Sequence, residues 1–198
     1  QPALLNQIAI WAKQEKDLPT RAYAVDVLSI QAGSQYQQLF EQALHDSSYS
    51  VAGAALEALV RHKPAAAIAA IATQKEDAKG RLKTAVKLAE YLTKDTADYN
   101  KIIAEYKKLA ILEKIMETNA LLYYANRLTE NAPFRKTVGT AIESYKLLRF
   151  DFRGLQSSIA STLQWMIQER EMALKKNPNN VVLQEQLKYL KEKNSAIN

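Results

Sequence analysis

Apolar and polar positions recur along the whole chain with the spacing of amphipathic helices. Helix start and stop signals predict helices at about residues 3–14, 20–31, 34–45, 49–62, 64–74, 77–93, 97–116, 118–130, 134–149, 152–176 and 180–193. The connections between them are only a few residues long, which favours consecutive helices that lie antiparallel as neighbours. The pattern therefore predicts an all-α fold made of stacked antiparallel helical hairpins.

The segment at residues 49–62 has almost no polar side. Its apolar positions surround most of the helix and leave chiefly Glu57 and Arg61 for water. Such a helix must be covered on several sides, and its alanines let neighbouring backbones approach closely. Residues 46–48, Asp-Ser-Ser, stand where a cap for its first amide groups is needed. We expect this segment to be an inner helix of the array.

Similar helical segments recur in the first half of the chain. The stretches that begin at Thr20, Ser50 and Arg81 align at offsets of about 30 residues. Three degenerate copies of one hairpin favour a HEAT-like α-α superhelix, a solenoid in which each hairpin buries its apolar face against the next.

After residue 95 the repeat loosens and the helices lengthen. Two apolar stripes have helical spacing: Phe134, Val138, Ala141, Ile142, Tyr145 and Leu148 form one, and Leu155, Ile159, Leu163, Met166 and Ile167 form the other. We expect the aromatic residues Tyr123, Tyr124 and Trp165 to pack in this core rather than to line a ligand site. The expected organisation is one domain, residues 1–198, with short repeats over 1–95 and longer helices plus a C-terminal capping hairpin over 96–198.

Composition supports helices and excludes several chemistries. Of the 198 residues, 47% are hydrophobic, enough for a core, and only five are Gly and five Pro, too few for a protein of many strands. Because there is no cysteine, disulfides, thiolate metal sites and a cysteine nucleophile are excluded. The longest mainly apolar run, residues 65–72, is far shorter than the roughly 20 residues that a membrane span needs, so no span is expected. The chain begins with Gln-Pro and not with Met, and we expect a piece of a longer protein or a processed product.

The net charge of +6 comes from the second half of the chain. Residues 1–100 carry 11 Lys or Arg and 11 Asp or Glu, whereas residues 101–198 carry 16 and 10. A Lys-rich outer face on long helices explains this excess more simply than a nucleic-acid or anionic-membrane surface does. Because no polybasic block occurs, nucleic acid is not an expected partner.

Few residues carry candidate chemistry. His45 and His62 close successive helices on the order of 20 Å apart, so they cannot share a metal ion, and each is expected at a helix C-terminus. Metal-binding, phosphate-loop and nucleophile-elbow motifs are absent from the sequence. Arg149 and Arg153 flank Asp151 in the break between two helices, where they could bind a carboxylate or phosphate or simply pair with Asp151. We predict no catalytic residue, metal ligand or cofactor site in this chain.

The segment LFEQALHDSSYSVAGAALEAL, residues 39–59, resembles a HEAT repeat, with an outer helix, an Asp turn, and an inner helix that carries Val and paired alanines. Together with LQSSIASTLQWMIQEREMALKK, residues 155–176, and the closing Leu-Lys hairpin, it looks like the C-terminal helical domain of zinc aminopeptidases of the aminopeptidase N type. That family holds its zinc with an H-E-x-x-H motif and a downstream glutamate. This chain lacks the motif, so no metal ligand or catalytic residue is carried over.

The resemblance implies a non-catalytic accessory domain. Such a domain closes over the catalytic cleft of the same parent chain and restricts the access of peptide substrates, while zinc belongs to the catalytic domain. A second hypothesis is a freestanding HEAT-like scaffold that binds a protein or peptide on the concave face lined by its inner helices. A third is nucleic-acid binding through the basic second half, which would weaken steeply with salt. An independent enzyme has the least support, because nothing assembles a nucleophile, a base and an orienting group.

Overall fold

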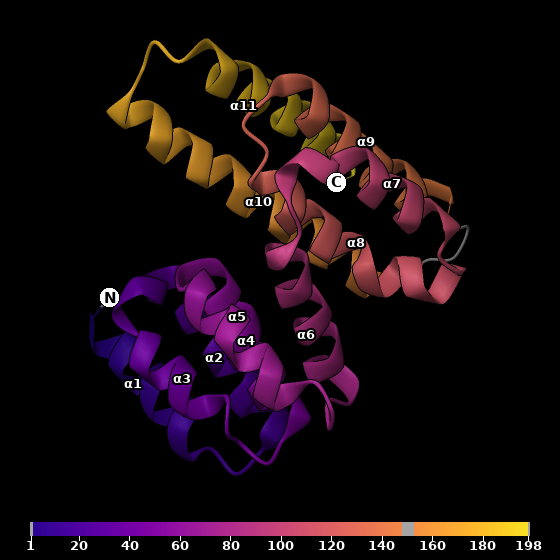
Figure 1. The fold of residues 1–198 in the computed structure, drawn as a ribbon. Helices are drawn as coiled ribbons and strands as arrows, with labels where there is room; N and C mark the ends of the chain where they lie inside the picture. Colours follow the sequence, from indigo (N-terminus) through magenta and orange to yellow (C-terminus); the bar gives the residue numbers. More distant parts are fainter. Residues whose placement is uncertain (1, 148–152, 198) are drawn as a thin grey trace. The chain divides into compact units, whose positions relative to one another are not determined.

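The computed structural model describes residues 2–147 and 153–197, and every regular element in those ranges is a helix (Figure 1). The predicted all-α class is therefore confirmed. The chain divides into two compact units, Gln1–Thr93 and Lys94–Asn198, which we call unit 1 and unit 2. No helix in the described ranges is long and apolar enough to cross a membrane. The HEAT-like superhelix and the single-domain organisation stay predictions.

Unit 1 is a row of three helical hairpins. Its helices are α1 (Pro2–Gln14), α2 (Leu18–Ala32), the short 3-10 helix η1 (Gly33–Gln35), α3 (Gln37–Ala43), α4 (Tyr49–His62), α5 (Pro64–Gln74) and α6 (Gly80–Thr93). Helix α1 packs on α2, α3 on α4, and α5 on α6, while α2, α4 and α6 pack against one another in sequence. The second helices of the hairpins therefore form an inner layer with α4 at its centre.

Helix α4 is buried over most of its circumference, as its sequence predicts. It packs against α2, α3, α5 and α6. Nine of its residues are buried: Val51, Ala52, Gly53, Ala54, Ala55, Leu56, Ala58, Leu59 and Val60. A Cβ atom added at Gly53 would lie 2.8 Å from the backbone of Arg81, so α4 and α6 approach each other closely at this point. The interpretation of residues 49–62 as an inner helix is confirmed.

The turn before α4 differs in detail from the sequence prediction. Ser48 occupies the N-cap position, but its side chain makes no capping hydrogen bond. The Asp46 carboxylate instead accepts a hydrogen bond from the backbone N–H of Ser48 at 2.8 Å and forms an ion pair with Arg21 of α2 at 2.9 Å. Asp46 thus fixes the turn and joins it to the neighbouring hairpin, and it does not cap the helix itself.

Unit 2 has longer helices in a different arrangement. They are the 3-10 helix η2 (Thr96–Asp98), α7 (Tyr99–Lys108), α8 (Ile111–Asn126), α9 (Asn131–Leu147), α10 (Arg153–Lys176) and α11 (Val181–Ser195). Helix α8 packs on α9, α9 on α11, α11 on α10, and α10 on α8, so these four helices close a ring around one core. Helix α7 packs on α8 and α9. The side chains in the centre of the ring include Leu121, Phe134, Val138, Ala141, Ile159, Leu163, Met166 and Leu190, all of which are buried.

The aromatic residues of unit 2 serve packing, as expected. The Tyr123 and Trp165 rings stack with centroids 4.6 Å apart. Tyr124 is fully buried, and its hydroxyl donates to the carbonyl oxygen of Asp95 at 2.7 Å. Tyr145, predicted on the same stripe as Phe134, is only half-buried, and Leu148 lies outside the described residues.

Several helix boundaries were predicted wrongly. The segments 97–116 and 118–130 were expected as helices, but α7 ends at Lys108 and α8 begins at Ile111. The break falls at Leu109 and Ala110, where no Gly or Pro marks it. It is stabilised by the Glu113 carboxylate, which accepts a hydrogen bond from the backbone N–H of Ala110 at 3.0 Å. The helix predicted at 77–93 begins instead at Gly80, whose φ of +49° favours glycine and interrupts any earlier helical turn.

Candidate functional site

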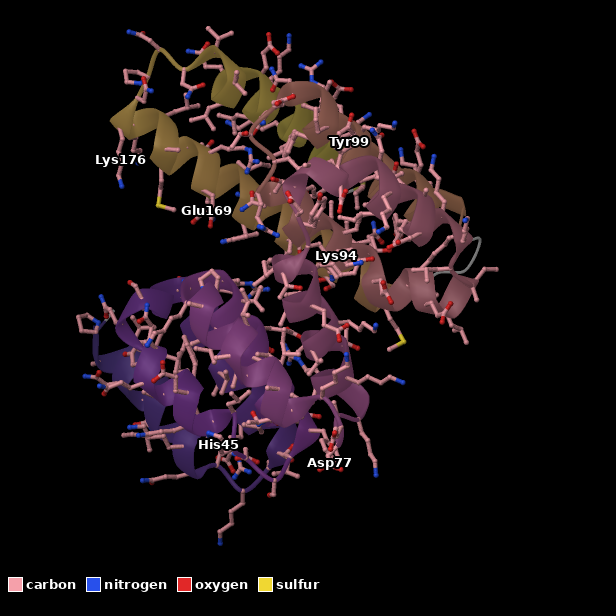
Figure 2. The ribbon with its side chains drawn as sticks, in the orientation of Figure 1. His45, Asp77, Lys94, Tyr99, Glu169 and Lys176 are labelled. Atoms are coloured by element: carbon pink, nitrogen blue, oxygen red, sulfur yellow. The ribbon has the colours of Figure 1, made fainter. Side chains whose placement is uncertain are left out.

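The two histidines have structural surroundings. His45 is exposed in the turn after α3 (Figure 2). His62 ends α4, as predicted, and its Nε2 lies 2.8 Å from the carbonyl oxygen of Ser29. The His62 ring fills the space beside Gly33, where an added Cβ would come within 2.0 Å of it. In the described ranges no group of three or more His, Cys, Asp or Glu side chains is placed to hold a metal ion.

The predicted anion contact is not tested. Arg149 and Asp151 lie outside the described residues. Arg153 is the first residue of α10, and its side chain is also outside the described part. Both alternatives for this pair of arginines, an anion contact or a pair with Asp151, therefore stay predictions.

A charge cluster joins the inner helices of unit 1. The Arg81 guanidinium on α6 donates from Nη1 to Asp26 on α2 at 2.9 Å and from Nη2 to the other Asp26 oxygen at 2.7 Å. It also donates from Nε and Nη2 to Glu57 on α4, at 3.1 and 2.6 Å. Burial by itself lowers the pKa of Arg81, but the hydrogen bonds and charges of the two carboxylates outweigh it and raise the pKa above its usual value. The cluster connects the inner helices of three successive hairpins. All three guanidinium nitrogens of Arg81 donate to a carboxylate.

Unit 2 contains a more deeply buried arginine. The Arg170 side chain on α10 is only 4% exposed. Its Nε donates to the Gln186 side-chain oxygen at 3.0 Å, and its Nη1 donates to the Asn126 side-chain oxygen and, at 3.4 Å, to the Met166 carbonyl. One face of the guanidinium lies over the Phe134 ring, 4.5 Å from the centroid. All of these partners are neutral.

Among the described residues, no carboxylate lies within ion-pair distance of Arg170. No described residue accepts a hydrogen bond from its Nη2. Burial lowers the pKa of Arg170 to about 10, while the charge of the neighbouring Glu169 acts in the opposite direction. The guanidinium therefore stays charged at neutral pH. Figure 2 marks Glu169, an exposed side chain on α10 next to this arginine.

A hollow of about 390 Å³ borders Arg170. Its walls combine amide side chains with apolar ones, and its lining residues are Asn126, Leu128, Thr129, Glu169, Arg170, Ala173, Asn180, Val182, Leu183 and Gln186. The volume falls in the range of pockets that hold small ligands, roughly 300–1,000 Å³. An apolar hollow with one buried cation and a few amides is a candidate binding site for a small ligand.

The sequence prediction missed both arginine sites. Arg170 lies between Glu169 and Glu171, and a mixed-charge stretch of this kind resembles a solvent-exposed helix face. A signal was available, because Leu163, Met166 and Arg170 share one helical stripe, and an arginine on an apolar stripe indicates a buried cation. Glu57 was predicted to face water because it is one of the few polar positions on residues 49–62, but its carboxylate pairs with Arg81.

Unit 1 exposes apolar surface on its first hairpin. Six large apolar side chains of α1 and α2 are exposed: Leu4, Ile10, Trp11, Leu18, Tyr23 and Ile30. Leu4 and Trp11 lie two turns apart on one face of α1, and Tyr23 and Ile30 share a face of α2 in the same way. Large exposed apolar side chains that lie together often mark protein contact surfaces, and these two helix faces are the candidates in unit 1.

Comparisons of the chain with models of protein families, with curated proteins and with solved structures found no match in any of the three. The resemblance to the aminopeptidase N family therefore depends on the sequence segments alone.

Proposed function

We propose that this chain is a non-catalytic accessory region of a zinc aminopeptidase and limits the access of peptides to a catalytic cleft formed elsewhere in the parent protein. The proposal is supported by the resemblance of residues 39–59 and 155–176 to that family. The observation that carries it is the row of three hairpins in unit 1, in which the segment 39–59 supplies α3 and the buried helix α4.

In this proposal the chain supplies a contact surface, and the catalytic groups belong to another domain of the parent protein. Zinc sites need three or four His, Cys, Asp or Glu ligands, and the described residues bring no such group together. The proposal assigns zinc and the catalytic groups to the parent's catalytic domain, as the resemblance to the family implies. This chain contributes a rigid surface, because Arg81 ties α2, α4 and α6 to one another through two carboxylates.

The exposed apolar side chains of α1 and α2 are the proposed contact with the catalytic domain. Burying several of them would stabilise the association by about 25 cal/mol for each Å² of apolar surface removed from water. Double substitution of Trp11 and Tyr23 by Ser should weaken binding of this chain to the separately expressed catalytic domain. Substitution of the exposed Met172 of unit 2 by Ser is the matched control and should leave that binding unchanged.

The decisive experiment compares the parent enzyme with and without residues 1–198. We expect the intact enzyme to prefer short peptides, and the shortened enzyme to cleave long and short peptides with similar kcat/KM. The open reading frame should also encode H-E-x-x-H and a downstream glutamate. An unchanged length preference, or a reading frame without the motif, contradicts the proposal.

A freestanding HEAT-like scaffold is the second candidate. The exposed apolar residues of α1 and α2 favour it as much as the first, because both functions need a protein contact. A stoichiometric complex between this chain and a protein that has no peptidase domain, lost in the Trp11 and Tyr23 double variant, would support the scaffold over the accessory domain.

A further inference from the structure

We infer that the hollow beside Arg170 binds the carboxylate of a ligand whose body is apolar, held by the guanidinium at one end and by aliphatic side chains along its length. This site is independent of the function proposed above. It lies within unit 2, and its lining residues come from α8, α10, α11 and the segments that join α8 to α9 and α10 to α11.

The electrostatics of Arg170 call for an anion. A guanidinium that is 4% exposed has lost most of its hydration, and a buried cation is ordinarily paired with a carboxylate. Here Gln186, Asn126 and Met166 supply neutral oxygens, which compensate only part of that loss. Contrast Arg81, whose three guanidinium nitrogens all donate to carboxylates. The positive charge of Arg170 is not neutralised within the described residues.

One nitrogen of the Arg170 guanidinium donates no hydrogen bond to the described residues. Nε and Nη1 are committed to their neutral acceptors and one face is covered by Phe134, but Nη2 donates to no described residue. Because Arg170 lines the hollow, a ligand oxygen placed there can accept from Nη2. The Asn126 side chain lies in the same wall and accepts from the guanidinium through its oxygen, so its NH2 group is close enough to donate to the ligand as well. The Gln186 NH2 group is already used by the carbonyl oxygens of Leu128 and Thr129.

The other side chains that line the hollow indicate which class of anion would fit. Leu128, Ala173, Val182 and Leu183 give the hollow an aliphatic side, which suits a hydrocarbon body. The site offers a single cation, and the exposed Glu169 at its edge disfavours a doubly charged group. A phosphate dianion carries two negative charges, of which the single cation of this site would balance one. A monocarboxylate of modest size matches both the charge and the walls.

Two sources could supply this chemistry, a free small carboxylate or the C-terminal carboxylate of a short peptide. Calorimetric titration of the full chain should therefore use N-acetyl-leucine, N-acetyl-Ala-Ala-Leu, the C-terminal amides of both, and inorganic phosphate. We expect each carboxylate to bind at least about tenfold more tightly than its amide, the effect of one charge-assisted contact. Tighter binding of the tripeptide than of N-acetyl-leucine identifies a peptide terminus as the ligand, and the reverse order identifies a free carboxylate.

Three variants locate the binding. Arg170→Gln removes the cation, and Ala173→Phe fills the hollow without altering the arginine; each should weaken carboxylate binding at least about tenfold. Arg135→Gln removes an exposed charge of the same unit outside the hollow and should change the affinity less than about twofold. If Arg170→Gln does not fold, Ala173→Phe decides the outcome.

Equal affinity for carboxylates and amides overturns the proposal. So does carboxylate binding that survives Ala173→Phe, tighter binding of phosphate than of either carboxylate, or no binding of any carboxylate at concentrations up to about 10 mM.

Discussion

Arg81 in unit 1 and Arg170 in unit 2 are placed in opposite surroundings. Arg81 is partly exposed and donates to two carboxylates from neighbouring helices, whereas Arg170 is buried and, among the described residues, donates to neutral acceptors only and lies over an aromatic ring. The less exposed arginine thus has the weaker charge compensation. The difference indicates that Arg81 holds helices together, whereas the charge of Arg170 has no carboxylate partner among the described residues and is proposed to bind one from a ligand.

The two units also differ in how their helices pack. In unit 1 the inner helices form an open row, and their contacts are made by close backbone approach and by the Arg81 cluster. In unit 2 four helices close a ring around a core of large side chains, and the hollow lies where α8, α10 and α11 meet around Arg170. A row gives extended surfaces, whereas a ring leaves space between its helices for a small ligand.

The largest expected effect is the loss of Arg81. Arg81→Met leaves Asp26 and Glu57 close together without their cation, so we expect the free energy of unfolding of unit 1 to fall by about 2 to 3 kcal/mol, less than for a fully buried pair. Arg170→Met should cost unit 2 about 1 kcal/mol or less, because water can enter the hollow and satisfy the freed oxygens of Gln186 and Asn126. Hydrogen exchange of the most protected amides of α4 and α8 measures both. If Arg170→Met lowered the free energy of unfolding more than Arg81→Met, the claim that Arg81 is the arginine that holds helices together would be wrong.

The next largest effect concerns two helical glycines. Gly53→Ala forces a Cβ to within 2.8 Å of the α6 backbone and should destabilise unit 1 by about 1 to 3 kcal/mol. Gly139→Ala in α9 is the matched control, because its Cβ would meet only the Tyr189 hydroxyl at 3.2 Å, the movable end of a side chain. Its higher helix propensity should then stabilise unit 2 by up to about 1 kcal/mol. Chemical denaturation followed by exchange in α4 and α9 tests the pair, and stabilisation of unit 1 by Gly53→Ala would contradict the close helix contact there.

Helix caps should behave alike in the two units. The Asp17 carboxylate accepts from the Thr20 backbone N–H, and the Asn180 side-chain oxygen accepts from that of Leu183, each at 3.0 Å. Asp17→Ala and Asn180→Ala should each cost about 1 kcal/mol. Ser48→Ala, which removes no capping bond, should cost almost nothing. A Ser48→Ala loss as large as the other two would contradict this assignment of caps.

The smallest effect is confined to alkaline pH. Burial, with added effects of Asp95 and Asp98 and an opposing one of Arg127, raises the pKa of Tyr124 to about 12 from an ordinary value of about 10. Because the folded state prefers the neutral phenol, its contribution to the stability of unit 2 is complete below pH 10 and is lost as the pH rises through 12. Tyr124→Phe should flatten this part of the pH dependence, measured as the difference between the two stability curves. Parallel curves would show that Tyr124 does not titrate in this range.

The helices of unit 1 follow from local sequence because each has its own signals. Residues 49–62 carry an apolar pattern that only an inner helix satisfies, and Pro64 opens the next helix. The break at Leu109 and Ala110 was missed because it depends on a capping contact from Glu113, which composition does not reveal.

The candidate sites depended on contacts far apart in sequence. Arg81 meets carboxylates that are 24 and 55 residues away, and Gln186 reaches Arg170 from the following helix. A charged residue's partners cannot be assigned until the helix packing is known, so a mixed run such as Glu169 to Glu171 resembles a solvated face. The position of Arg170 on the stripe of Leu163 and Met166 is the one local sign of its burial.

The central claim is that the Arg81 guanidinium is fully engaged while that of Arg170 retains a free donor for a carboxylate. The most direct test is NMR of the guanidinium groups in the intact chain, with ¹⁵N-labelled arginine, during titration with N-acetyl-leucine. We predict that the Nη signals of Arg170 shift and sharpen as the ligand binds, while those of Arg81 do not move. Unchanged Arg170 signals, or equal shifts for both arginines, would contradict the account.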